Sequence, residues 1–184
     1  MYTTLGALKA YLGIGGGADD ALLEAMVERA SATVDALCNR TFRADADSTR
    51  TFDVLLDVGG RTLWLDRDLC AVTSVVNGDG QPIDSGDLLL LPRGGPPFAQ
   101  IGLARDSDVY WQGDGEIVVT GRWAYSVTPP DTIVQATERL AAWFYRQKDV
   151  GYEPARPTFA GITYTSDLPA DVRALIAPFR RVAL

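Results

Sequence analysis

Apolar positions repeat with a helical period near both ends of the chain and with a period of two between them. Residues 131–148 form the longest helix-patterned stretch, and Pro130 suits a first helical turn because its missing N–H would have no partner there. The apolar arc of this helix covers about half of the circumference, wider than the ~100° stripe of an ordinary surface helix. The arc contains Ile133, Ala136, Thr137, Leu140, Ala141, Trp143 and Phe144. We expect such a helix to contact more than one neighbour.

Two interpretations of this helix are open. It is either a central helix inside one domain, or a helix shared between its own domain and an adjacent subunit. In the second case part of the arc buries against another helix, and basic side chains lie at the subunit boundary. The interface predicted on this basis consists of Ala136, Arg139, Leu140, Trp143 and Arg146.

Two further helices are predicted near the N-terminus. The first covers residues 5–12 and has threonines before it that can cap it. Residues 13–17 are rich in glycine, but they follow a helix and lack the Lys-Ser/Thr of a phosphate loop, so we interpret them as a flexible link. The second helix starts at Asp19 or Asp20 and runs to about Arg40. Its core stripe is Leu23, Met26, Val27, Ala30, Val34, Leu37 and Cys38.

The period changes to two from residue 41 to about residue 126, which predicts five to seven short strands. Apolar and polar residues alternate over residues 52–58, and Gly59-Gly60 predicts a two-residue hairpin turn. The strands predicted after this turn cover residues 62–65, 72–76, 88–91, 109–111 and 116–120.

These elements predict an α+β fold. It is a helical bundle, made of the N- and C-terminal helices, with an inserted small antiparallel β-sheet or sandwich. The predicted parts are residues 1–41 with the N-terminal helices, residues 42–126 with the β region, and residues 127–184 with the long helix and a C-terminal arm. The first and third parts are expected to pack together as one helical unit.

The chain ends in an apolar and basic tail. Pro169 opens a last short helix and Pro178 ends it. The tail is too short to form a core, so it either docks into a groove of a partner or folds back over the chain's own helices. The residues predicted to dock are Phe179, Arg180, Arg181, Val182 and Leu184.

Composition narrows the class of protein. The chain has 184 residues, of which 47% are hydrophobic, and a formal net charge of −7. This charge argues against a protein that grips nucleic-acid phosphates, although it is compatible with DNA passing by. The sequence has no run of 18 apolar residues, so no membrane span is predicted. The two cysteines are too few for a disulfide framework. We therefore expect a soluble cytosolic product with no membrane partner.

The chain has no histidine. Ser-His-Asp and Cys-His nucleophile systems and histidine-based metal sites are thereby excluded. Carboxylates gather in two groups that we compared with a metal site: Asp79, Asp84 and Asp87, and then Asp106, Asp108, Asp114 and Glu116. Neither group has the spacing of a calcium-binding loop, and turn formation explains them without an ion. We expect no catalytic residues, no metal and no cofactor.

Segments distributed in order over nearly the whole chain resemble the head–tail connector (adaptor) proteins of tailed bacteriophages and prophages. Each segment alone is a weak motif, and the specificity lies in their order. They are Thr-Leu-x-x-Leu-Lys-x-Tyr-Leu-Gly-Ile at 4–14, Asp-Asp-Ala-Leu-Leu-Glu at 19–24, Cys-Asn-Arg-Thr-Phe at 38–42, Leu-Trp-Leu at 63–65, Val-Thr-Ser-Val-Val with an Asn-Gly turn at 72–78, Gly-Glu-Ile-Val-Val-Thr-Gly at 115–121, the Pro-Pro helix from 129, and Leu-Pro-Ala-Asp-Val-Arg-Ala-Leu-Ile-Ala-Pro-Phe-Arg at 168–180. Many members of the family are shorter and almost entirely helical, so the β region departs from the common form.

The resemblance implies a structural role in the virion neck, after assembly in the host cytoplasm. Such connectors form a homo-oligomeric ring, commonly of twelve subunits, beneath the portal protein. They hold a stopper or tail-completion protein around a channel through which DNA passes without sequence-specific binding. The alternatives are a small carboxylate-dependent hydrolase and a non-viral β-type binding or assembly module.

Overall fold

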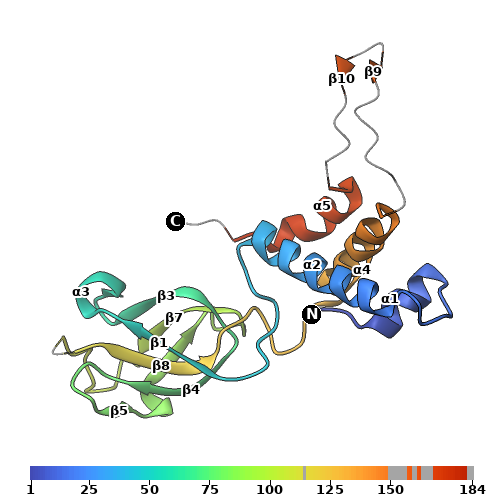
Figure 1. Cartoon of the computed structure of the whole chain (residues 1–184). Coiled ribbons are helices and arrows are strands. Elements are labelled where there is room, and N and C mark those ends of the chain that lie inside the picture. Colours follow the sequence, from blue (N-terminus) through green and yellow to red (C-terminus); the bar gives the residue numbers. More distant parts are fainter. Residues whose placement is uncertain (114, 149–156, 159–160, 163–167, 182–184) are drawn as a thin grey trace. The chain divides into compact units, whose positions relative to one another are not determined.

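The chain forms two compact units in the computed structural model, which describes residues 1–113, 115–148, 157–158, 161–162 and 168–181. The helical unit is built from residues 1–39 and 130–184, and the β unit from residues 40–129. Figure 1 shows both units, with most of their helices and strands labelled. The predicted α+β class, with antiparallel strands inserted into a helical bundle, is confirmed.

In its described residues the helical unit has four α-helices, which are α1 (Leu5–Leu12), α2 (Asp20–Cys38), α4 (Asp131–Arg146) and α5 (Ala170–Ile176). A 3₁₀ turn, η2 (Ala177–Phe179), follows α5, and two short strands, β9 (Pro157–Thr158) and β10 (Gly161–Ile162), pair with each other. Helix α1 begins at Thr4, whose hydroxyl accepts from the N–H of Ala7, and ends at Gly13 in the left-handed conformation. Helix α4 lies along α2, and α1 and α5 also contact α4 (Figure 1). No helix in the parts of the chain described here is long and apolar enough to cross a membrane.

The β unit consists of two four-stranded antiparallel sheets. Their strand orders are β1-β8-β4-β5 and β2-β3-β7-β6. The strands of the first sheet are β1 (Ser48–Phe52), β8 (Ile117–Arg122), β4 (Ala71–Val76) and β5 (Pro82–Ile83). Those of the second are β2 (Val58–Gly59), β3 (Thr62–Leu69), β7 (Phe98–Leu103) and β6 (Leu88–Leu91). A short helix, α3 (Val54–Asp57), precedes β2, and a 3₁₀ turn, η1 (Ser85–Asp87), precedes β6.

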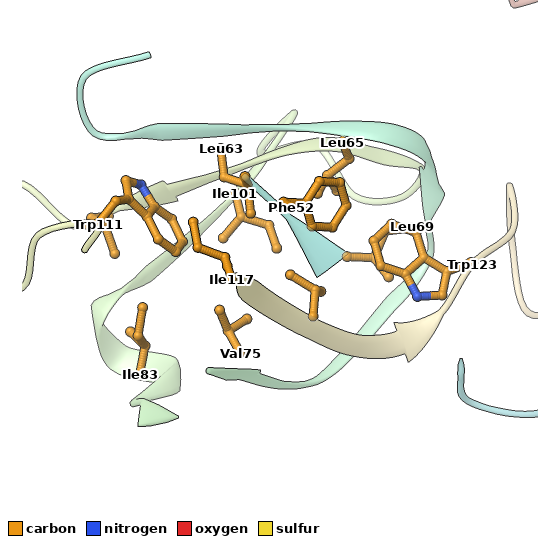
Figure 2. Close-up of a cluster of buried hydrophobic side chains, with 12 residues drawn as sticks. Phe52, Leu63, Leu65, Leu69, Val75, Ile83, Ile101, Trp111, Ile117 and Trp123 are labelled. Atoms are coloured by element: carbon orange, nitrogen blue, oxygen red, sulfur yellow. The ribbon is translucent and has the colours of Figure 1, made fainter. Parts of the chain in front are cut away.

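The two sheets share one hydrophobic core, shown in Figure 2. Alternate residues of β3 and β8, such as Leu63 and Leu65 or Ile117 and Val119, point into it. The buried set is Phe52, Leu63, Leu65, Leu69, Val75, Ile83, Ile101, Leu103, Trp111, Ile117, Val119 and Trp123. The indole N–H of Trp123 donates to the carbonyl of Ser48 at 2.9 Å, so this aromatic ring is buried with its polar group satisfied.

Helix α3 replaces a predicted strand. The alternation over residues 52–58 favoured a strand, but Asp53 caps a helical turn instead. Its Oδ1 accepts from the N–H of Leu55 at 2.6 Å, and its own N–H donates to Oδ2 of Asp57 at 2.8 Å. These two side-chain bonds satisfy the backbone locally, so the period of two is not expressed as a strand.

Two other strand assignments also differ from the structure. Residues 109–111 are not in a strand. The Asn77 side chain forms hydrogen bonds with the backbone here instead: it donates to the carbonyl of Tyr110 at 2.8 Å and accepts from the N–H of Gln112 at 3.0 Å. Strand β7 was missed because Gly102 and Gln100 interrupt its apolar pattern and prolines precede it. The predicted turn at Gly59-Gly60 lies one residue later, since Gly59 pairs with Thr62.

Candidate assembly surfaces

Helix α4, to which the predicted subunit interface was assigned, is covered by α1, α2 and α5 of its own unit. Its buried residues are Ile133, Ala136, Thr137, Leu140, Ala141 and Ala142. The expectation that this helix meets more than one neighbour is confirmed. The neighbours come from within the chain, which accounts for most of the wide apolar arc.

Ala136 and Leu140 have no exposed surface in this structure. A side chain without exposed surface cannot contact a second subunit while its unit stays closed. Their assignment to a subunit interface is therefore corrected: both are core residues, packed where α4 lies along its neighbours.

The other three predicted interface residues keep exposed surface. The side chain of Arg139 is 37% exposed, and its Nη1 lies 2.5 Å from Oδ2 of Asp171 on α5. This hydrogen bond lowers the pKa of the Asp171 carboxyl. Trp143 is half-buried with its ring centroid 5.3 Å from that of Phe144, and Arg146 is exposed. Their contact with a second subunit stays a prediction.

Polar contacts tie the chain's own segments to the end of α4. Asp19, before α2, accepts from the Tyr145 hydroxyl at 2.5 Å and from the Lys148 ammonium at 2.8 Å. The hydrogen bond from Lys148 is the largest cause that lowers the pKa of Asp19, and the bond from Tyr145 is the next. The bond to Asp19 raises the pKa of Lys148. On α4 itself Glu138 accepts from the Thr3 hydroxyl at 2.8 Å. These bonds fix the entry to α2 and the N-terminus against α4.

The C-terminal segment lies against the last turn of α2. The backbone N–H of Arg181 donates to the carbonyl of Cys38 at 2.8 Å, and Nε of Arg180 donates to the carbonyl of Leu37 at 3.1 Å. Carbonyls in the last turn of a helix have no partner within the helix and carry partial negative charge, so these donors satisfy them favourably.

Arg180 and Arg181 therefore cover the end of α2, as in the alternative interpretation of the tail, although the Arg180 side chain keeps exposed surface. Phe179 is half-buried, and a contact of this segment with a portal stays a prediction. The other two predicted docking residues, Val182 and Leu184, lie outside the described residues.

Carboxylates and cysteines are the candidate metal ligands of this chain without histidine. Within the described ranges, no three Cys, Asp or Glu side chains gather as metal ligands. Both cysteines are buried, and burial raises the pKa of the Cys70 thiol. Asp114, a member of one of the carboxylate groups, lies outside the described residues.

The sequence did not reveal an exposed apolar tip on the β unit. Leu55 and Leu56 of α3 are 89% and 85% exposed, more than the other large apolar side chains found exposed. The period of two had assigned them to a strand with one side buried. The signal that could have found them is the pair Asp53 and Asp57, which bracket a four-residue turn.

Comparison with known proteins gives matches to solved structures only. No family model matches the chain, and no curated protein matches it. A structure described as the neck of an empty gene transfer agent particle computed with C6 symmetry contains a similar chain, with a TM-score of 0.64 and 19% identity. The match covers 100% of this chain and 91% of that one.

Two further structures give the same result. A chain in the virion of a native gene transfer agent particle aligns with a TM-score of 0.61 and 18% identity, over 100% of this chain and 91% of that one. A chain in the neck of a native particle computed with C12 symmetry aligns with a TM-score of 0.62 and 16% identity, over 98% and 89%. The chain thus shares its whole fold, including the β unit, with chains of these phage-like particles. This agrees with the resemblance to head–tail connectors.

Proposed function

We propose that the protein is a structural head–tail connector of a tailed phage, a prophage or a related particle. The observation that carries this proposal is the likeness of fold over the full length to chains in particle necks. A likeness that includes both units is more specific than one restricted to a helical bundle, since few connectors are expected to carry a β insertion in the same place.

The proposed role is non-enzymatic. The chain has no histidine, and within its described part the carboxylates do not form a metal-binding group. Most polar contacts of the helical unit join one segment of the chain to another, as at Arg139 and Asp171 or at Asp19 and Lys148. Such contacts between distant segments suit a subunit with a structural role, because they keep the helical unit in one shape.

Self-association into a ring is part of the proposal. The similar chains belong to necks computed with C6 and C12 symmetry, and cyclic assemblies are made by repeating one head-to-tail contact. A ring of twelve subunits would fit both symmetries. On the helical unit, Arg139, Trp143 and Arg146 remain candidates for the contact because they keep exposed surface.

We further assign the C-terminal segment to the portal side and the opposite side of the ring to a stopper or tail-completion protein. The exposed side of Arg180, together with Phe179, Arg181, Val182 and Leu184, would meet the portal. The net charge of −7 suits a neck channel, because like charge keeps passing DNA from binding. The location that follows is the virion neck, after assembly in the host cytoplasm.

Mass measurement of the purified protein, alone and mixed with the portal protein of the same genome, tests the proposal. We expect a ring of defined stoichiometry, either alone or on the portal. A protein that stays monomeric in both samples, and is missing from purified particles, would contradict it.

Truncation tests the portal contact separately. Deleting residues 179–184 removes the two bonds to the end of α2, so we expect a lower melting temperature as well as loss of portal binding. Arg180→Ala with the tail retained is the matched variant, because it removes one bond and leaves the Arg181 backbone in place. Full portal binding by the truncated protein would exclude the C-terminal segment from the contact.

A further inference from the structure

The tip of the β unit presents two leucines on a turn held by its own side chains. Leu55 and Leu56 are 89% and 85% exposed. The bonds between Asp53 and Leu55 N and between Asp53 N and Asp57 fix the backbone of this turn. Both flanking residues are carboxylates, so the tip is apolar in the middle and negatively charged at its base.

A cavity of the opposite character lies at one end of the sheet β2-β3-β7-β6. Its volume is about 480 Å³, and it is lined by Arg61, Leu89, Arg93, Leu103, Ala104, Arg105 and Asp106. The three arginines outnumber the single aspartate, and the remaining lining is aliphatic. A volume of this size lies within the range of pockets that bind small ligands or side chains.

Arg61 holds the loop at one side of the cavity in place. Its Nη2 donates to the carbonyls of Ala104 at 2.6 Å and Ser107 at 3.0 Å, and its guanidinium lies 5.2 Å from the ring centroid of Tyr110. Arg93 and Arg105 are exposed and form no ion pair with any described residue. Two of the three cations are therefore available to a partner.

The apolar side of the cavity continues over the outer face of the same sheet. Leu88 and Leu90 pack against the core, so Leu89 and Leu91 alternate to the outside. The register places Trp64, Gln100 and Leu91 in one row across the sheet, and Trp64 is 52% exposed. This outer face thus combines a tryptophan with an arginine rim, and tryptophan and arginine are residue types that dominate binding energy at protein interfaces. The two leucines add apolar area.

We propose that the tip at residues 53–57 of one copy docks into the Arg61–Arg93–Arg105 cavity of a neighbouring copy. The leucines would fill the aliphatic part, and the carboxylates of Asp53 and Asp57 would face the exposed arginines. This contact rests on the proposed self-association and names the surface that carries it. Because tip and cavity are different surfaces, their contact can repeat head to tail, and it builds a ring when the rotation between neighbours closes.

A second copy fits the surface better than the other occupants do. The tip cannot already occupy the cavity of its own chain, since both leucines are exposed. DNA phosphates would match the arginines but would leave the leucines and Trp64 in water. A small anion would likewise use only the polar part of the cavity.

Two variants with opposite defects test the contact. The tip variant carries Leu55→Gln and Leu56→Gln, which keep side-chain size on an exposed turn. The cavity variant carries Arg93→Glu and Arg105→Glu and leaves Arg61, which holds the loop. The control carries Val127→Gln, at a half-exposed apolar position, and Arg29→Glu, at an exposed basic position on α2.

Each defective variant should lower the affinity of self-association by about tenfold or more relative to wild type and control. Sedimentation and native mass spectrometry measure this affinity. Mixing the two variants should restore one intact contact and give a heterodimer that does not grow further. Melting temperatures equal to wild type establish that the variants fold. The single changes Leu56→Gln and Arg105→Glu repeat the test if a double variant melts lower.

The outcomes separate the contact from the ring. If wild-type protein forms a ring and both variants do so equally well, the contact is wrong and the ring stands. If wild type forms only a dimer that the variants abolish, the contact stands and the ring is wrong. A wild-type protein that stays monomeric at millimolar concentration contradicts the contact, and the ring is also wrong if the protein forms none on the portal. If the cavity variant loses binding to duplex DNA while it assembles normally, the arginines serve DNA, and the contact is wrong.

Discussion

At the scale of single residues, Asp35 on α2 is a carboxylate whose environment opposes its charge. It is half-buried, and burial raises its pKa, although the hydrogen bond from the Tyr2 hydroxyl acts in the opposite direction. It also lies near the C-terminal end of α2, where the helix dipole disfavours negative charge. The native state therefore binds the proton more tightly than the unfolded state does.

Asp35→Asn should accordingly stabilise the protein at neutral pH. A raised native pKa means that stability falls as pH rises from the unfolded pKa, near 3.8, through the native value. Asparagine keeps an acceptor for Tyr2 and carries no charge. The variant should unfold at a higher temperature than wild type at pH 7, and the difference should disappear below the unfolded pKa. Equal melting temperatures at pH 7 would show that the Tyr2 bond offsets the burial.

Residue roles were predictable where one periodicity decided them. The helical stripe correctly placed Leu23, Val27 and Cys38 in the core. It could not separate Leu140 from Trp143, because both lie on one arc and only the positions of α1 and α5 decide which is covered. Periodicity also gave no sign that Arg180 bonds a carbonyl on α2, since that contact joins segments far apart in the sequence.

At the scale of elements, helix α4 provides a direct comparison of core and rim. Leu140 is completely buried, whereas Trp143 is only half-buried. Leu140→Ala should cost about 2–5 kcal/mol of unfolding free energy. Trp143→Ala should cost less than the ~3–5 kcal/mol of a fully buried tryptophan. Urea denaturation of both variants measures the order, and a larger loss for Trp143→Ala would mean that its ring is the main anchor of the helix.

The pairing of β8 with β4 depends on a glycine. A Cβ at Gly121 would lie 2.2 Å from the carbonyl oxygen of Ala71 and 3.1 Å from Cδ1 of Leu69. The first contact is with backbone, which cannot rotate away, so Gly121→Ala should cost at least about 2 kcal/mol. Gly86→Ala is the matched control, because nothing lies within 4 Å of its Cβ. Urea midpoints that are the same for both variants would contradict this account.

Helices and strands were predicted correctly where the local sequence pattern was strong. Helix α1, which Thr4 caps, and helix α2, which has a long apolar stripe, were found close to their true ends. Helix α3 and the stretch at residues 109–111 were assigned wrongly because the side chains of Asp53 and Asn77 satisfy backbone groups that a strand would leave to its neighbour. Such bonds depend on geometry that an apolar pattern does not contain.

At the scale of the whole molecule, the alternation of periods was enough to predict a helical bundle with an inserted antiparallel region. The same alternation could not tell how eight strands divide between two sheets, since register and strand order depend on contacts between distant segments. It also gave no information on the complementary tip and cavity, which arise from turns and sheet ends rather than from repeating positions.

The β unit should fold when it is excised as residues 40–129. Its twelve core side chains all lie between Phe52 and Trp123, so the core is complete within the fragment. Its ends are held together by the bond from Tyr125 N to Thr41 O at 2.8 Å and by the bridge between Arg43 and Ser126. A domain of this size can bury enough apolar surface to be stable alone.

We therefore expect the fragment to unfold in one cooperative transition and to give a circular dichroism spectrum rich in β-structure. Leu63→Ala in the same fragment is the control: it removes a completely buried side chain, which should cost about 2–5 kcal/mol and lower the transition clearly. A fragment that is unfolded, or whose transition does not respond to Leu63→Ala, would show that this core forms only when the helical unit is present. If the fragment folds, it also allows the contact between tip and cavity to be measured without the helical surfaces, because both elements lie within residues 53–106.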